Sequence, residues 1–440
     1  MYRRISHRPN LVKIVDNIGW LFFDKIVRMG IGLLVGVWVA RYLGPERFGL
    51  LSFAAAFAGL FSPLSTIGLP SIVVRDLIRD PESKEESLGA AALLQFAAGL
   101  FSYAMLVAVI FWLRPEDALA KTMVAIIGTL LLFKVSDVAV YWFESQVQSK
   151  YTVWVQNGVF LVFATIKIGL ILSHSTLIAF AWAMMAEAGI VAIVMLVVLG
   201  LREPQLRYLH FSFDRAKYLL VNSWPLLLAG VAITIYVKID QIMLGQMMGD
   251  QSVGIYSSAV RISEVFYFIP VMVTASVFPS VMDAKKQSET LYYDRLQKLF
   301  NLMVWISIVV ALSMTFLSSE IIKLLFGAAY ATAGPVLSVH IWAATFVFLG
   351  VASSQWYIVE NRQILSLQRA ALGAFVNVIL NLLLIPKYGV IGAAWATVAS
   401  YGVADMFFDL IHKDTRKIFK MKIYAFHLTS ARTLFKLDKI

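Results

Sequence analysis

Apolar stretches of about twenty residues or more recur along almost the whole chain, and this feature restricts the fold more than any other. A helix needs roughly 20 apolar residues to cross the hydrocarbon core of a bilayer. The chain is 60% hydrophobic and only 15% charged, whereas a soluble domain is about half apolar and a quarter charged. The sequence therefore predicts an all-α polytopic membrane protein. The twelve candidate transmembrane helices are 17–40, 48–70, 88–113, 119–143, 151–172, 176–201, 219–244, 253–281, 299–319, 331–358, 364–386 and 388–411.

The positions of the basic residues predict the orientation of these spans. If the N-terminus is cytoplasmic, 26 of the 38 Lys and Arg residues fall in inside segments, six fall in outside loops and six fall within spans. This count places Arg369 with the adjoining inside segment and Lys121 with the adjoining outside loop, because both lie near the ends of their spans. Cytoplasmic loops of membrane proteins carry this kind of Lys and Arg excess. We therefore expect a multi-pass protein of the cytoplasmic (inner) membrane with both termini cytoplasmic. The basic tail KDTRKIFKMK is expected to contact anionic membrane lipids and not nucleic acid.

A weak internal repeat predicts the domain organisation. When the chain is shifted by 205 positions, Gly44 falls on Gly249 and Gly49 falls on Gly254. Such repeats in transporters form two lobes with the cargo site at the midplane between them. We expect two six-helix lobes related by a pseudo-two-fold axis along the membrane normal. The predicted parts are a cytoplasmic N-terminus (1–16), an N-lobe with helices 1–6 (17–201), a cytoplasmic linker (202–218), a C-lobe with helices 7–12 (219–411) and a basic cytoplasmic tail (412–440).

Six cationic residues lie inside the predicted spans. A cation at the centre of a membrane helix costs about 2.5–3.5 kcal/mol on insertion scales. We therefore expect these side chains to face a shared wet interior instead of lipid, and a basic interior favours an anionic cargo. The six residues are Lys25, Arg28, Lys134, Lys167, Lys238 and Arg261.

Arg28 and Arg261 are the main candidate substrate-binding residues. Asp24 lies four residues before Arg28, and Glu264 lies three residues after Arg261, so each acid shares a helix face with its arginine. A planar guanidinium donates two hydrogen bonds at once to a diphosphate or a carboxylate. We interpret the arginines as diphosphate ligands, with Asp24 and Glu264 as gating residues that hold them when cargo is absent. A purely structural ion pair is the alternative.

Lys25 and Lys238 are further candidate diphosphate ligands, although snorkelling to the membrane interface also explains them. Asp240 is a candidate for gating or ion coupling, because an acidic group at membrane depth can bind H+ or Na+. Asp405 and Asp409, which share a face near the inner end of the last span, are candidates for the same reason. The remaining charges within spans, Lys134 with Asp137, Lys167 and Glu187, are interpreted as isolated cases.

Several classes of enzyme are excluded by what the sequence lacks. The chain has no cysteine, and its six histidines show no metal-ligand spacing. No Walker loop, HExxH or GxSxG motif is present. We therefore expect no catalytic residues, no metal site and no cofactor, with coupling to H+ or Na+ as the possible energy source.

Four sequence segments carry a resemblance to a known family: DKIVR…VARYLGPERFGLLSFA near the N-terminus, GLPSIVVRDL at 68–77, WFESQVQSKY ending at Tyr151, and NVILNLLLIPKYGVIGAAWATVAS at 377–400. On these segments the chain resembles the oligosaccharide flippases, the Wzx-type polysaccharide repeat-unit transporters, of the multidrug/oligosaccharidyl-lipid/polysaccharide exporter superfamily. We interpret the last segment as scaffold, in which Pro386 and Gly389 form a turn and Gly392 allows close helix approach.

The resemblance implies two six-helix lobes around a cationic cavity that opens alternately to each side of the membrane. It implies that the cargo is an undecaprenyl-diphosphate-linked oligosaccharide, such as an O-antigen repeat unit, which moves from the inner to the outer leaflet. Arg28 and Arg261 match arginines of the related lipid II flippases, but Leu34 and Ser62 stand where those proteins carry further arginines. The implied partners are the lipid-linked oligosaccharide, membrane lipids and polysaccharide polymerase machinery.

Three alternatives remain open on the sequence alone. An ion-coupled exporter of a drug or another amphiphile would respond to cations and need no lipid-linked intermediate. A non-transporting partner of a polysaccharide synthase would tolerate changes in the cavity. A membrane-embedded glycosyl transferase would usually need a larger outer loop than this chain has.

Overall fold

The computed structural model describes residues 9–207 and 209–430, and within these ranges the chain is helical throughout, with short connections and no strand. In the part of the chain that the structure describes, ten helical segments are long and apolar enough to cross a membrane. Many large apolar side chains on these segments are exposed, including Trp112, Phe316 and Leu172, as expected for a surface that faces lipid. The prediction of an all-α polytopic membrane fold is confirmed.

The chain divides into two compact units. Unit 1 comprises Met1–Leu43 and Leu50–Thr234, and unit 2 comprises Gly44–Gly49 and Ile235–Ile440. The division falls inside two long helices, α2 (Pro9–Thr66) and α9 (Phe213–Met247), and not in a loop. The lobe boundaries drawn from the repeat stay a prediction.

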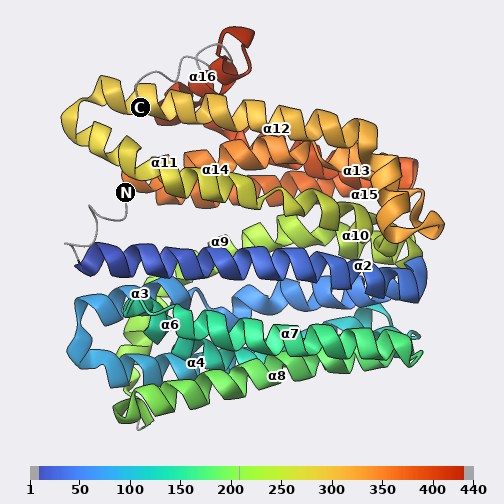
Figure 1. Cartoon of the computed structure of the whole chain (residues 1–440), viewed down its shortest axis with the longest axis horizontal. Coiled ribbons are helices and arrows are strands. Elements are labelled where there is room, and N and C mark those ends of the chain that lie inside the picture. Colours follow the sequence, from blue (N-terminus) through green and yellow to red (C-terminus); the bar gives the residue numbers. More distant parts are fainter. Residues whose placement is uncertain (1–8, 208, 431–440) are drawn as a thin grey trace. The chain divides into compact units, whose positions relative to one another are not determined.

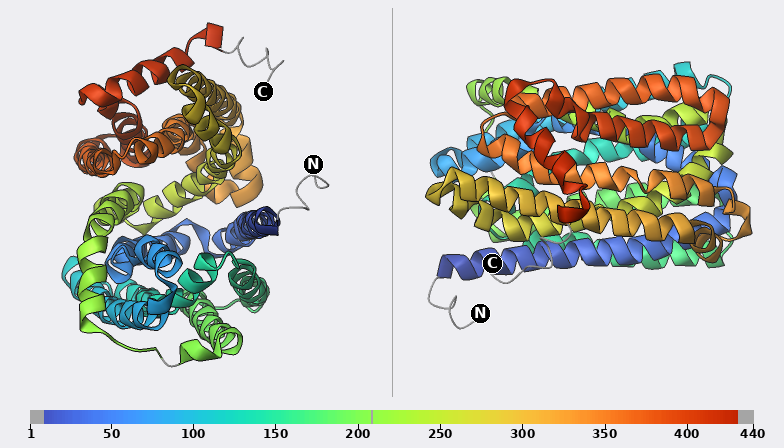
Figure 2. Two further views of the ribbon diagram at one scale, coloured as in Figure 1. Left: turned by 90° about the vertical axis from the view of Figure 1, so that its left-hand side faces the viewer. Right: turned by 90° about the horizontal axis from the view of Figure 1, so that it is seen from above.

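Unit 1 packs its helices side by side, and Figure 2 (left) shows them nearly end-on. Its main core joins α3, α4, α6 and α8 through residues such as Leu77, Phe143 and Met195. Figure 1 shows α7 and α8 as an antiparallel hairpin. The elements of unit 1 besides its part of α9 are α2 (Pro9–Thr66, apart from 44–49), α3 (Leu69–Arg79), η1 (Pro81–Ser83), α4 (Lys84–Leu113), α5 (Ala118–Gly128), η2 (Thr129–Ser136), α6 (Asp137–Ser145), α7 (Lys150–Leu172), α8 (Leu177–Arg202) and η3 (Pro204–Arg207).

Unit 2 builds its main core from α11, α12, α14 and the tail helix α16, through residues such as Phe300, Phe348 and Ile418. The tail helix is therefore part of the packed unit. The elements of unit 2 besides its part of α9 are α10 (Asp250–Val265), α11 (Phe268–Gln287), α12 (Glu289–Phe326), η4 (Ala328–Tyr330), α13 (Ala333–His340), α14 (Ala343–Val359), α15 (Gln363–Asp405), η5 (Phe407–Leu410), η6 (Lys413–Thr415) and α16 (Arg416–Ala425).

Two of the ten membrane-crossing segments are long enough for two crossings each. Gly19–Arg79 has 61 residues and Ile364–Leu410 has 47 residues, whereas one crossing needs roughly 20. Each contains a glycine outside the helical region, Gly44 (φ 73°, ψ 171°) or Gly389 (φ 61°, ψ −139°). The expected break at Gly389 is confirmed, and the total of twelve spans stays a prediction.

The glycines matched by the internal repeat adopt nearly the same backbone conformation. Gly249 has φ 84° and ψ 172°, close to the angles of Gly44. This region of backbone space is essentially restricted to glycine. The matched residues therefore share a conformational requirement as well as an identity.

The second matched pair forms a reciprocal contact within unit 2. A Cβ added to Gly49 would lie 1.7 Å from the carbonyl oxygen of Asp250, and a Cβ added to Gly254 would lie 1.9 Å from that of Pro45. Each glycine thus lies against the start of the other repeat segment. The two segments pack backbone to backbone, which no residue with a side chain permits.

We predict that Gly49→Ala and Gly254→Ala each destabilise the protein, because the new methyl group must displace main chain. Overpacking of this kind costs about 1–3 kcal/mol. The measurement is thermal unfolding of the purified protein in detergent. Gly169→Ala on α7 is the matched control, because a Cβ there meets no atom within 4 Å. Equal melting temperatures for all three variants would contradict the contact.

Candidate functional site

The six cations within the predicted spans differ in whether a carboxylate lies beside them. Four of them lie within 4.0 Å of a carboxylate. Lys134 lies beside Asp137, as grouped in the sequence, whereas the interpretation of Lys167 and Glu187 as isolated charges is wrong. Lys25 and Arg261 make no ion pair in the part of the chain that the structure describes. The four pairs are Arg28–Asp24 at 2.7 Å, Lys134–Asp137 at 3.3 Å, Lys167–Glu187 at 2.6 Å and Lys238–Glu264 at 4.0 Å.

Arg28 lies at the centre of a polar cluster in unit 1. Its Nε donates to Asp24 Oδ1 at 2.7 Å, and its Nη2 donates to Gln156 Oε1 at 2.9 Å. The side-chain amide of Asn157 donates to the same Asp24 oxygen at 3.0 Å. These bonds join α2 to α7 and hold the guanidinium in place while its side chain stays 37% exposed. Arg28 is therefore both positioned and accessible.

Two residues of this cluster, Gln156 and Asn157, were missed in the sequence. The available signal was the pair of adjacent amides inside the otherwise apolar segment 151–172. Lys25 lies three residues before Arg28 on the same helix and is exposed, so the two cations neighbour each other on the helix surface.

Arg261 has a different environment in unit 2. Its guanidinium lies over the ring of Phe48, with Cζ 5.2 Å from the ring centroid, a cation–π geometry. Glu264, the expected partner of Arg261, lies instead within 4.0 Å of Lys238 Nζ. Arg261 thus keeps its planar fork free of an ion-paired carboxylate among the described residues, while Lys238 is balanced by Glu264.

Asp240 is enclosed in unit 2 and is only 2% exposed. The hydroxyls of Tyr256 and Thr397 donate to its Oδ2 at 2.7 and 2.6 Å, and the amide of Asn381 donates to its Oδ1. In the described part of the chain no Lys or Arg forms an ion pair with Asp240, so its carboxylate is held by neutral donors alone. A buried charge without a counter-charge is costly, and such residues inside membranes mark ion pathways.

The oxygens around Asp240 fit a small hard cation. Asn381 Nδ2 also donates to Asn377 Oδ1 at 3.0 Å, and Asn381 Oδ1 is buried and has no hydrogen-bond partner among the described residues. Carboxylate, amide and hydroxyl oxygens are the ligands that hard cations prefer. Asn377, Asn381 and Thr397 all belong to the segment interpreted as scaffold, so that interpretation is incomplete. The missed signal was the Asn-x-x-x-Asn spacing, which places both amides on one helix face.

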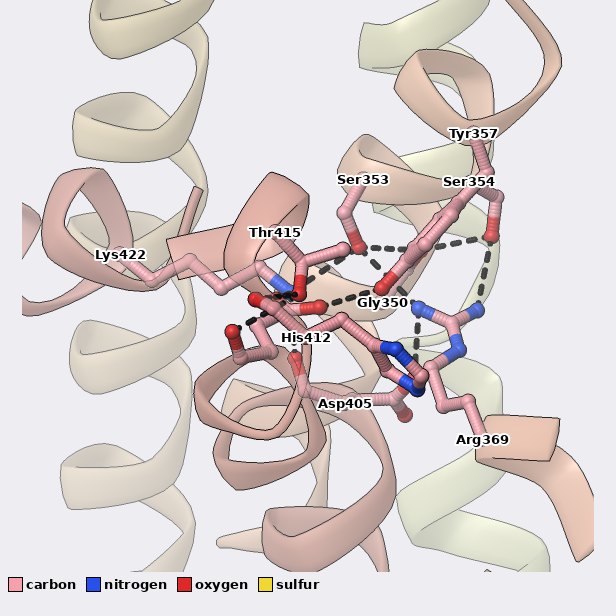
Figure 3. A network of polar contacts seen from close by, with 10 residues as sticks. Gly350, Ser353, Ser354, Tyr357, Arg369, Asp405, His412, Thr415 and Lys422 are labelled. Atoms are coloured by element: carbon pink, nitrogen blue, oxygen red, sulfur yellow. Dashed lines mark hydrogen bonds and ion pairs between the residues drawn. The ribbon is translucent and has the colours of Figure 1, made fainter. Parts of the chain in front are cut away.

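Asp405 and Asp409 belong to a buried network of opposite charges, of which Figure 3 labels Asp405, Arg369 and Lys422. Arg369 Nη1 lies 3.3 Å from Asp405, and Lys422 Nζ lies 2.8 Å from Asp409. Tyr357 donates to the other oxygen of Asp409. Because each carboxylate has its own cation, the interpretation of this pair as a proton or sodium site is not supported, and we assign the network a structural role.

Lys422 is the residue that attaches the tail helix α16 to this network. Its side chain is fully buried, and its ammonium also donates to the main-chain oxygen of Asp405 at 2.6 Å and to Ser353 at 3.1 Å. Burial lowers the pKa of Lys422, and the charge of Asp409 opposes that shift. The tail that was expected to lie on lipid therefore contributes one of its lysines to the interior of unit 2.

The long apolar helices, with charged and polar residues held inside each unit, define a polytopic helical membrane protein. The family described as "Polysaccharide biosynthesis protein" matches residues 14–285, and the chain belongs to this family. The resemblance to the oligosaccharide flippases is thereby confirmed.

Curated relatives match over most of the chain. The chain is 20% identical over 394 residues to the capsular polysaccharide biosynthesis protein CapF of Staphylococcus aureus, covering 89% of this chain and 97% of that protein. It is 21% identical over 400 residues to the probable low-salt glycan biosynthesis flippase Agl15 of Haloferax volcanii, covering 87% and 80%. The first relative is described as a polysaccharide biosynthesis protein and the second as a probable flippase.

Two solved structures share the fold. An inward-facing multidrug resistance MATE transporter of the MOP superfamily matches with a TM-score of 0.74 and 14% identity, over 93% of this chain and all of that chain. The lipid II flippase MurJ in an inward closed conformation matches with a TM-score of 0.72 and 16% identity, over 97% and 93%. At this identity the similarity establishes the fold.

We predict that Lys422→Met destabilises unit 2 by about 3 kcal/mol, because it leaves Asp409 buried without its cation. The double variant Lys422→Met with Asp409→Asn should recover much of that loss, since no uncompensated charge remains. Thermal unfolding measures both effects. Lys420→Met is the control, because Lys420 is exposed on the same helix. A single variant as stable as the control would show that the ion pair is dispensable.

Proposed function

We propose that this protein flips a lipid-linked oligosaccharide across the cytoplasmic membrane by alternating access. The cargo in this proposal is a polysaccharide or O-antigen repeat unit on undecaprenyl diphosphate, and the direction is from the inner to the outer leaflet. Membership of the polysaccharide biosynthesis family supports the saccharide part, together with the flippase description of a relative that covers 87% of this chain.

The observation that best supports binding of the diphosphate is the environment of Arg28. It is fixed by two hydrogen bonds from one side, yet more than a third of its side chain is exposed. A guanidinium held in this way loses little conformational freedom when it binds a phosphate, so more of the interaction energy appears as affinity. Hydrogen bonds to charged groups contribute about 1.5–3 kcal/mol each.

Asp24 has a second role in this proposal, because it neutralises Arg28 while no anionic cargo is bound. A diphosphate that approaches Arg28 competes with Asp24 for the same donor. The amide of Asn157, which also bonds Asp24, would keep that carboxylate hydrogen-bonded after the exchange. The cost of releasing Arg28 is thereby reduced.

Arg261 is proposed to bind the diphosphate from unit 2. Its guanidinium rests on an aromatic ring and makes no ion pair among the described residues, so its charge is available to an anion. Lys238 is a weaker candidate, because Glu264 already balances it. Lys25, which is exposed three residues before Arg28, stays a candidate ligand of the same phosphate.

We further propose that Asp240 binds the coupling ion, H+ or Na+. The argument is the contrast with Asp409, which is equally buried but has a lysine beside it. Asp240 has only neutral donors, so a proton or a sodium ion is the species that would balance its charge. For Na+, the oxygens of Asp240, Asn381 and Thr397 would be the ligands.

We predict that Arg28→Ala slows flipping at least tenfold, because a charge-assisted contact with the diphosphate is lost. The measurement is the transfer of a fluorescent polyprenyl-diphosphate oligosaccharide in proteoliposomes. Arg28→Lys should retain part of the rate, since it keeps the charge and loses the fork. Arg261→Ala should act in the same direction.

The matched control for Arg28→Ala is Arg41→Ala, which removes an exposed arginine farther along the same helix. Wild-type transfer rates in both Arg28→Ala and Arg261→Ala would exclude the proposed diphosphate ligands. The same assay tests the cargo, because a polyprenyl monophosphate analogue should be transferred more slowly than the diphosphate.

We predict that Asp240→Asn abolishes acceleration by an ion gradient while leaving slow exchange in its absence. The assay compares wild-type transfer in proteoliposomes with a Na+ gradient, with a pH gradient and with neither. Asp214→Asn, an exposed acid on α9, should behave like the wild-type protein. If neither gradient changes the wild-type rate, or if Asp240→Asn still responds, the coupling proposal is wrong.

A further inference from the structure

We propose that the paired ends of α7 and α8 form a binding site for an anionic phospholipid, with the phosphate between Lys150 and Arg202. Lys150 is the first residue of α7, and Arg202 is the last residue of α8. The two helices form an antiparallel hairpin in unit 1 (Figure 1), so both cations lie at the same end of it. The basic residues of the flanking segments predict that this end faces the cytoplasm.

The two cations converge on a single aromatic ring. Lys150 Nζ lies 5.1 Å and Arg202 Cζ lies 4.7 Å from the centroid of the Tyr151 ring. The ring is itself held by Phe143, with the centroids 5.2 Å apart, and it packs against the core of unit 1. Tyr151 therefore gives the cations a fixed support.

No carboxylate pairs with either cation among the described residues. This differs from the cations inside the spans, most of which have an acid within 4.0 Å. Both cations line the same hollow, and an anion bound there would offset their like charges. Basic pockets between transmembrane helices on the cytoplasmic side are suited to anionic lipid headgroups.

A hollow of about 520 Å³ adjoins the two cations and provides space for the ligand. Its wall combines Lys150, Arg202 and Tyr151 with the apolar residues Trp154, Val155, Val198 and Leu201. Trp154 and Leu201 are 65% and 66% exposed. A free phosphate would leave this apolar wall uncovered, whereas a phospholipid covers it with its acyl chains. The combination of a cationic rim and an apolar wall therefore favours a lipid.

The site lies on the helix that supports Arg28. Trp154 packs against Trp20 of α2 with ring centroids 5.5 Å apart, and Asn17 of α2 accepts a hydrogen bond from the main-chain nitrogen of Ser149 at 2.7 Å. Residues 156 and 157, which position Arg28 and Asp24, follow on the next turn of α7. A lipid bound here would stabilise the α2–α7 contact.

The test titrates the purified full-length protein in neutral detergent with short-chain phosphatidylglycerol and follows its melting temperature. Phosphatidylcholine with the same chains and inorganic phosphate are the two comparison ligands. We expect phosphatidylglycerol alone to raise the melting temperature. Lys150→Gln and Arg202→Gln should each weaken the apparent affinity about fivefold, and the double variant about 25-fold.

Lys217→Gln is the control, because Lys217 is an exposed cation of unit 1 outside this hollow. If the double variant does not fold, native mass spectrometry of the two single variants provides the measurement, with lower retention of phosphatidylglycerol expected in each. A wild-type response in the variants would overturn the proposal. Equal stabilisation by phosphatidylcholine would exclude recognition of the anionic headgroup, and equal stabilisation by phosphate would exclude the lipid.

Discussion

A charge inside an apolar protein is stable only beside an opposite charge or within a set of hydrogen-bond donors, and the interior of both units follows this constraint. Asp405 and Asp409 each have a cation, and the network they form attaches the tail helix to unit 2. Lys167 and Glu187 balance each other between α7 and α8. These buried charges are thus balanced by a neighbouring residue of opposite charge and need no functional explanation.

The charges that depart from this pattern are the ones to which we assign a function. Asp240 is enclosed by neutral donors, Arg261 rests on an aromatic ring, and Arg28 shares a single carboxylate while remaining accessible. Lys150 and Arg202 share one ring instead of an acid. In each case the structure holds the charged side chain in place but does not fully balance its charge. We assign the balancing charge to a bound partner, which is a cation for Asp240 and an anion for the basic residues.

Backbone packing at the repeat imposes a second constraint. Gly44 and Gly249 adopt the same conformation, which requires glycine, and Gly49 and Gly254 contact each other's segment without space for a side chain. The sequence match at these positions, weak as a statistical signal, therefore has a physical cause. A comparable break occurs at Gly389, where Gly392 lies so close to the main chain of Leu384 that a Cβ would be 2.3 Å from its oxygen.

The sequence by itself determined the all-α polytopic fold class and the pairing of Asp24 with Arg28, because hydropathy and helical spacing are local properties. It did not reveal that Glu264 pairs with Lys238, that Asn381 and Thr397 enclose Asp240, or that Lys422 is buried. These contacts join residues on different helices, and helical periodicity does not specify which faces meet. Only the tertiary structure decided which charges were balanced, because a counter-charge acts through distance in space and not through separation along the chain.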